Sequence, residues 1–176
     1  FKLNLKSSGN ISYKPFPKPH LLVEKASINF PQSEKKDDFI NTSNLKIFIS
    51  LRDVYLRTFY NFLSAEISKT NLYLELSDII KIRKHLYRKI NKPINFNDCK
   101  IFINNNRKEV ILISPVKKIS YKINNKTKIK HFDVYGEIFG LNFKSEWERN
   151  YNTHDQSFHS INFYNPNIEI KNILKS

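Results

Sequence analysis

Apolar and polar residues alternate with a period of two along most of the chain. This period is typical of β-strands that bury one face, because successive side chains point to opposite sides of a strand. Breaks with turn chemistry separate the runs at residues 104–106, 114–115, 124–125 and 165–167. Because tight turns join antiparallel neighbours, the pattern predicts a mainly β fold built as a long antiparallel meander. The predicted strands are 3–5, 10–14, 20–30, 44–51, 66–76, 97–103, 109–114, 117–123, 129–139, 141–148, 157–164 and 168–174.

One segment has helical spacing instead. Between residues 76 and 90, apolar residues recur three and four positions apart, which predicts an amphipathic helix over about residues 76–91. Ser77 or Asp78 can cap its start, and Pro93 follows its end. Its basic face is either solvated, as on an ordinary helix packed on a sheet, or lies against anionic headgroups. The residues concerned are Lys81, Lys84, Arg88 and Lys89.

A single helix of this length is too small to cover the predicted sheet. About fifteen residues give a helix of roughly 22 Å, whereas ten strands span about 50 Å. The sheet must therefore curl into an open groove that suits acyl chains, or close on itself as a β-sandwich. Six residues share strand faces and are expected to line the inside of the groove; in the closed alternative they form the core. They are Ile119, Tyr121, Ile123, Leu141, Phe143 and Trp147.

The formal net charge of +14 suggests an anionic partner. However, Lys, Asn and Ile are abundant together, and AT-rich codons encode all three, so compositional bias explains the lysines without a partner. They are scattered, with no arginine-rich tract, zinc-binding spacing or RNA-binding aromatic motif. Nucleic acid is therefore the weaker prediction, whereas attraction to an anionic lipid surface requires no motif.

No set of residues predicts an active site. The five histidines are dispersed, the three glycines cannot form a phosphate-binding loop, and no serine lies in a nucleophile motif. Glu146 and Glu148 share a strand face, where surface pairing with Lys144 and Arg149 is expected. The single cysteine, Cys99, lies in an apolar alternation and is expected to be a small buried side chain. We expect no catalysis, no metal and no cofactor.

The first thirty residues place a glycine, a short strand, a proline corner and an apolar strand in order. Three prolines within residues 15–19 force a stiff bend between strands, because proline lacks an N–H and restricts its predecessor. This order resembles the start of the AsmA family of Gram-negative envelope proteins. The resemblance includes a later strand over residues 45–56 and rests on Gly9, Ile11, Tyr13, Pro17, Pro19, Leu21, Val23, Ala26 and Ile28.

A second segment carries the same resemblance. Gly136 lies inside a strand, where glycine allows a bulge, and Gly140 follows at an expected turn. The arrangement over residues 133–143 is similar to repeated segments of AsmA family proteins. The helix predicted over about residues 76–91 departs from the family pattern, in which a loop containing Gly, Asn or Trp often stands at that point.

The resemblance implies that residues 1–176 are a single N-terminal periplasmic domain segment of an envelope protein, with further strands downstream. The resemblance also implies a membrane anchor upstream of Phe1, since the periplasmic part of the family follows an N-terminal anchor. The absence of methionine predicts that residues precede Phe1, and the sequence itself has no apolar run of 18 residues. The implied role is non-enzymatic: outer-membrane biogenesis and transport of phospholipid or another membrane lipid between the inner and outer membranes. The apolar β-groove would resemble that of chorein-type bridge proteins, and other envelope proteins are further partners. One alternative is a closed β-sandwich adaptor that binds a periplasmic protein, and the weaker one is a basic nucleic-acid-binding domain.

Overall fold

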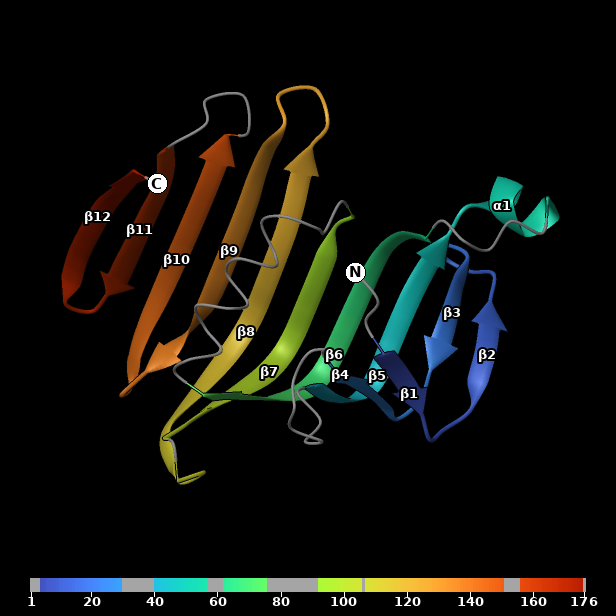
Figure 1. Ribbon diagram of the computed structural model, residues 1–176, viewed down its shortest axis with the longest axis horizontal. Helices are drawn as coiled ribbons and strands as arrows, with labels where there is room; N and C mark the ends of the chain where they lie inside the picture. Colours follow the sequence, from blue (N-terminus) through green and yellow to red (C-terminus); the bar gives the residue numbers. More distant parts are fainter. Residues whose placement is uncertain are drawn as a thin grey trace.

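The computed structural model describes residues 4–29, 40–56, 62–75, 92–105, 107–150 and 156–175. These residues form one open sheet of 12 strands, which runs from β2 at the right of Figure 1 to β12 at the left. The predicted mainly β class and the open form of the sheet are therefore confirmed. The strands are β1 (Asn4–Ser7), β2 (Ile11–Lys14), β3 (His20–Val23), β4 (Ala26–Asn29), β5 (Ile40–Ile49), β6 (Phe62–Glu75), β7 (Ile94–Asn104), β8 (Val110–Asn124), β9 (Ile129–Ile138), β10 (Leu141–Asn150), β11 (Gln156–Tyr164) and β12 (Asn167–Lys175).

One strand pair departs from the antiparallel pattern. Strands β5 to β12 are neighbours in chain order, and β6 pairs with β7 in parallel. The long stretch of chain between Glu75 and Ile94 explains the difference, because a parallel pair needs a crossover rather than a tight turn. The helix predicted over about residues 76–91 falls in this stretch and lies outside the described residues. The helix that the structure does describe is α1 (Leu51–Tyr55), which follows β5.

Proline and loop positions were predicted with mixed success. The proline corner lies between β2 and β3, as expected. The turn predicted at residues 114–115 is wrong, because β8 runs through Pro115 without a break. Pro115 lies beside a register shift between β8 and β9, a place where a sheet tolerates a missing N–H. The strand predicted over residues 44–51 begins earlier than expected, since β5 starts at Ile40 and buries both Ile40 and Thr42. Residues 30–39 lie outside the described part.

Along one line that crosses the strands, the core-facing positions of each strand switch between odd-numbered and even-numbered residues. We call this line the crease. Strict alternation places residues three positions apart on opposite faces of a strand. Here the strand register continues across the line, yet two residues three positions apart both face the core in each of five neighbouring strand paths. The pairs are Val23 and Ala26, Thr42 and Leu45, Ile67 and Thr70, Phe96 and Cys99, and Val116 and Ile119.

Left-handed backbone conformations accompany the crease. Lys25, Lys69 and Asp98 have φ angles of 52°, 53° and 52°, and each lies between the two members of a buried pair. A residue in this conformation rotates the strand, so that alternation resumes with the opposite parity. In Figure 1 the lower ends of β6 and β7 sweep sideways from the direction of their upper parts. The single strand predicted over residues 20–30 is accordingly divided into β3 and β4 at Lys25.

The core lies inside the bend that the crease makes. Val23, Leu45 and Ile67 from one side of the crease form one cluster with Leu72 and Cys99 from the other. Cys99 is 2% exposed, which confirms its predicted buried position. The other members of the cluster are Ala26, Ile28, Ile40, Val116 and Ile119.

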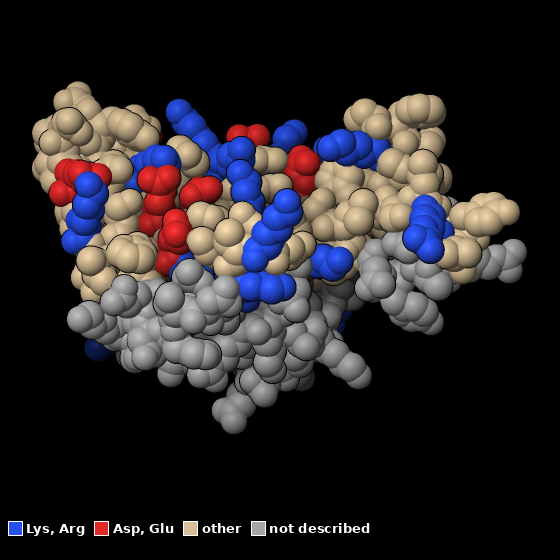
Figure 2. Space-filling model, turned by 90° about the horizontal axis from the view of Figure 1, so that it is seen from above, with Lys and Arg blue, Asp and Glu red and all other residues tan. Residues whose placement is uncertain are grey.

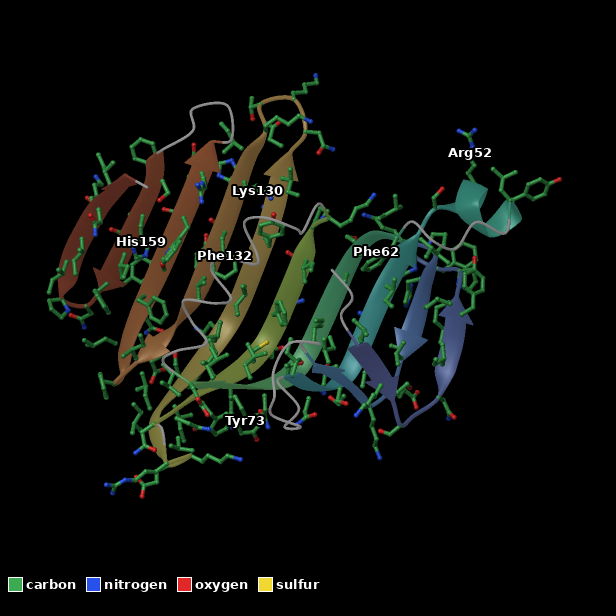
Figure 3. All side chains as sticks on the ribbon, viewed as in Figure 1. Arg52, Phe62, Tyr73, Lys130, Phe132 and His159 are labelled. Atoms are coloured by element: carbon green, nitrogen blue, oxygen red, sulfur yellow. The ribbon has the colours of Figure 1, made fainter. Side chains whose placement is uncertain are left out.

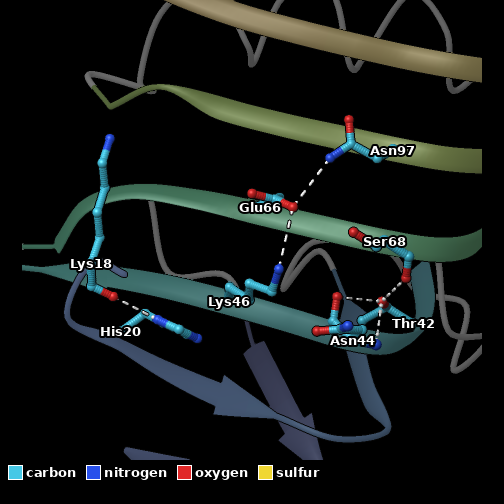
Figure 4. Close-up of polar contacts among 8 residues, drawn as sticks. All are labelled: Lys18, His20, Thr42, Asn44, Lys46, Glu66, Ser68 and Asn97. Atoms are coloured by element: carbon cyan, nitrogen blue, oxygen red, sulfur yellow. Dashed lines mark hydrogen bonds and ion pairs between the residues drawn. The ribbon is translucent and has the colours of Figure 1, made fainter. Parts of the chain in front are cut away.

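The outer face of the sheet carries polar contacts between neighbouring strands (Figure 4). Lys46 on β5 lies 3.6 Å from the Glu66 carboxylate on β6, and the Asn97 side chain on β7 donates a hydrogen bond of 3.2 Å to the same carboxylate. On the core side, at the crease, the Thr42 hydroxyl donates to the Ser68 carbonyl at 3.1 Å, which satisfies a buried polar group.

The two glycines of the C-terminal half lie where the sequence predicts them. Gly136 faces the register shift between β8 and β9, and a Cβ added there would lie 2.9 Å from the Pro115 carbonyl oxygen. Gly140 has a φ of 79° in the turn between β9 and β10, a conformation that glycine adopts at little cost. Among the described residues, no helix has the length and apolar character needed to cross a membrane.

Lys69→Val tests the crease. We expect this change to lower the free energy of unfolding by about 1–2 kcal/mol, because a β-branched side chain is poorly compatible with a positive φ. Lys100→Val is the matched control, since Lys100 is an exposed residue of β7 that is not among the positive-φ positions; its expected effect is within about 0.5 kcal/mol. Urea unfolding followed by circular dichroism measures both, and equal losses would contradict the role given to Lys69.

Cys99 tests the burial of the core. Burial, with a smaller contribution from the neighbouring Asp98 carboxylate, raises the pKa of the Cys99 thiol to about 11. We expect iodoacetamide at pH 8 to leave the folded protein unmodified and to alkylate the urea-unfolded chain, because only the thiolate reacts. Intact-mass measurement reads the result, and rapid labelling of the folded protein would show that the core is open at this point.

Candidate functional site

The six residues predicted to line a groove lie on one face of the sheet. Ile119, Tyr121 and Ile123 belong to β8, and the other three belong to β10. Strand β9 connects the two sets, because Phe132 is the register partner of both Tyr121 and Trp147. We call this side of β8 to β12 the apolar face. Ile119, Tyr121 and Phe143 are buried in it, whereas Leu141 at its far end is 38% exposed.

The strand register arranges the apolar face in four rows that cross the strands. Rows are about 7 Å apart, since two residues of a strand rise about 3.4 Å each. Row one holds Ile123, Lys130, Arg149 and Ser157, and row two holds Tyr121, Phe132, Trp147, His159 and Asn172. Row three holds Ile119, Val134, Ser145, Ile161 and Ile170, and row four holds Val116, Gly136, Phe143, Phe163 and Ile168.

Exposure of the apolar face increases toward β12. In row three, Ile119 on β8 is 5% exposed and Ile170 on β12 is 52% exposed. In row four, Phe143 on β10 is 8% exposed and Ile168 on β12 is 48% exposed. The face is therefore a core at β8 and an accessible apolar surface at β11 and β12.

Row one differs from the other rows because it carries two cations. Lys130 and Arg149 are register partners on β9 and β10, and Lys130 is only 6% exposed. Burial lowers the pKa of Lys130, and repulsion from the Arg149 guanidinium lowers it further. Figure 3 shows Lys130 near the start of β9, with Phe132 of row two next along the strand.

Row two combines aromatic rings with polar tips. The Trp147 and His159 rings lie 4.3 Å apart between centroids, at an angle of 54°. His159 also makes a 3.1 Å hydrogen bond through Nε2 to the hydroxyl of the buried Ser145. Phe143 and Phe163 of row four have ring centroids 6.3 Å apart, so aromatic contacts also join β10 to β11 there.

The opposite face of the same strands is charged. The Lys144 ammonium lies 2.6 Å from the Glu146 carboxylate, which confirms the surface pairing predicted for Glu146 and raises the pKa of Lys144. Glu148 lies 3.5 Å from His131 on β9, whereas alternation places Arg149 on the apolar face. Figure 2 shows acidic side chains among lysines and arginines on the side that it draws, rather than one block of positive charge.

Sequence reasoning did not identify Lys130, Phe132 and Val134 as parts of this face, although they connect the two predicted strands. The signal was present, because these residues alternate along β9 in the same parity. When every second residue of a strand is apolar and one of them is a lysine, that lysine is a cation on the apolar face. His159 and Ile161 continue the rows on β11 in the same way.

The four residues predicted to face an anionic surface lie outside the described part of the chain, so their prediction stays open. They are Lys81, Lys84, Arg88 and Lys89.

Comparison with known proteins assigns no family to the chain. No protein-family model matches it, and no curated protein matches it. The resemblance to the AsmA family therefore stays a prediction that rests on the residues named above.

Lys130→Met tests the electrostatic cost of row one. We expect this change to raise the free energy of unfolding at pH 7, on the order of 1 kcal/mol, because it removes a charge whose pKa the folded state lowers. The unfolded chain binds the Lys130 proton more tightly, so the advantage of the variant is complete below the lowered folded-state pKa. It disappears as the pH rises toward the ordinary value near 10.5.

Urea unfolding of Lys130→Met and wild type between pH 7 and pH 10.5 measures this difference. Lys122→Met, an exposed lysine on the opposite face of β8, is the matched control and is expected to change little. A loss of stability in Lys130→Met at pH 7 that exceeds the control would contradict the cost assigned to this charge.

Proposed function

We propose that this chain is a non-enzymatic lipid carrier of the AsmA type, which acts in outer-membrane biogenesis in the periplasm of a Gram-negative cell. Its cargo is phospholipid or another membrane lipid that travels between the inner and outer membranes. A segment upstream of Phe1 anchors it to the inner membrane, and other envelope proteins complete the path.

The observation that carries the proposal is the continuity of the apolar face across an open sheet. The face extends from buried positions on β8 to half-exposed isoleucines on β12, while the Lys144–Glu146 ion pair and the His131–Glu148 contact occupy the opposite face. An acyl chain on the accessible part is stabilised by about 0.8 kcal/mol for each methylene that leaves water. A surface of this kind needs no catalytic group, because transfer of lipid makes and breaks no bond.

A protein partner is the second candidate, and a different observation favours it. Among the described strands, β12 is an edge of the sheet, and it exposes isoleucine on both faces: Ile170 at 52% and Ile173 at 57%. Such an edge accepts an added strand through main-chain hydrogen bonds. A periplasmic adaptor function would use this edge rather than the rows of the apolar face.

The single tryptophan provides a direct test, because Trp147 lies in row two of the apolar face. We expect phospholipid with brominated acyl chains to quench Trp147 fluorescence, and the same lipid without bromine to leave it unchanged, since bromine quenches only on contact. Lipid mass spectrometry of the purified protein provides the cargo directly. Absence of both quenching and bound lipid would contradict lipid carriage and favour the adaptor function.

Two isoleucines of β12 form a matched pair of variants. Ile170→Asp places a charge on the apolar face, and Ile173→Asp places the same charge on the opposite face at nearly equal exposure. We expect Ile170→Asp to weaken lipid binding at least tenfold, because an acyl chain over a carboxylate must desolvate it. Ile173→Asp is expected to bind lipid as the wild type does. Equal weakening by both variants would contradict binding on the apolar face.

A further inference from the structure

The rows of the apolar face change chemistry in a fixed order along the strands. Row one carries the cations Lys130 and Arg149, and row two carries Tyr121, Trp147 and His159, whose aromatic side chains each include a polar hydroxyl or ring nitrogen. Rows three and four are aliphatic and aromatic apart from Ser145 and the backbone of Gly136.

This order matches the order of groups in a phospholipid at a membrane surface. Phosphate is the outermost anionic group, tryptophan and tyrosine gather at the headgroup boundary, and the acyl chains lie below. The distance fits as well. Rows two to four span about 14 Å, close to the roughly 15 Å of hydrocarbon in one leaflet, and row one lies beyond them.

We propose that the apolar face binds an anionic phospholipid parallel to the strands, with its phosphate at Arg149 and Lys130 and its acyl chains over rows two to four. This inference rests on the proposed function and adds the headgroup and the orientation of the cargo. The occupant is a lipid rather than a free anion, because the cations form one end of a continuous apolar surface.

The two cations have different parts in this site. Arg149 is partly exposed, and a guanidinium can hold two phosphate oxygens at once, so Arg149 contacts the headgroup. Lys130 is almost buried and lies beside Arg149, so it adds positive potential next to the guanidinium.

The headgroup is tested with short-chain brominated lipids presented as monomers, so that no charged membrane surface attracts the protein. Phosphatidylglycerol is the anionic probe and phosphatidylcholine with identical chains is the zwitterionic probe. We expect phosphatidylglycerol to bind about tenfold more tightly, as measured by quenching of Trp147. Equal affinities would overturn the headgroup site and leave lipid carriage standing, whereas no quenching by either lipid would overturn both.

Two double variants of equal net charge separate the site from general attraction. Lys130→Gln with Arg149→Gln removes the row-one cations, and Lys118→Gln with Lys122→Gln removes two exposed lysines from the opposite face of β8. We expect the first pair of changes to abolish the preference for phosphatidylglycerol and the second to retain it. Equal loss in both double variants would overturn the proposal.

Single variants keep the test valid if the first double variant does not fold, as judged by circular dichroism. Arg149→Lys retains the charge without the two-oxygen geometry, so we expect it to lose part of the preference and Arg149→Gln to lose most of it. A preference that is unchanged in Arg149→Gln would overturn the role of Arg149.

The orientation and the source of the phosphate have separate readouts. Bromine near the headgroup end of the chain is expected to quench Trp147 more strongly than bromine at the chain terminus, because Trp147 is one row from the cations. The reverse order would overturn the orientation. Inorganic phosphate at millimolar concentration is expected to leave lipid binding unchanged, and competition by it would show a site for free phosphate instead.

Discussion

A β-strand turns successive side chains to opposite faces, and this sheet keeps one apolar side only because it reverses that alternation along the crease. Without the reversal, a strand that buries Ile67 would expose Leu72. The reversal must occur at the same level in neighbouring strands, because their hydrogen-bonded register continues across it. The left-handed backbone at Lys25, Lys69 and Asp98 supplies it in three of the five strand paths, at a local cost that burial of the shared core offsets.

The crease and the rows divide the sheet into two regions with different roles. Strands β3 to β8 bend around a core and are stabilised by apolar contacts across the crease. Strands β9 to β12 continue the same face beyond the bend, and its exposure is greatest on β12. One sheet thus stabilises itself at one end and presents an accessible apolar surface at the other. The buried charge of Lys130 is a cost to stability that a purely structural core would avoid.

Alternation with a period of two was sufficient to predict the mainly β class and the common face of Ile119, Tyr121 and Trp147, because strand geometry fixes which side chains share a side. It was insufficient for the crease, since lysine has no particular preference for the left-handed conformation that Lys69 adopts. The parallel pair of β6 and β7 also escaped a pattern based on short turns. Lys130 was overlooked because a single lysine in an alternating run is ordinarily assigned to solvent.

Strands β11 and β12 end the sheet in a way that allows further strands to extend it. Each row gains one side chain per strand, so a strand added beside β12 would lengthen all four rows at once and leave the existing ones in place. The width of the apolar face would therefore increase with the number of strands, while the distance from row one to row four stays constant. A longer sheet of this kind would have many equivalent binding sites side by side, each with its cations at the same end. A bound lipid could move from one site to the next without reversing its orientation.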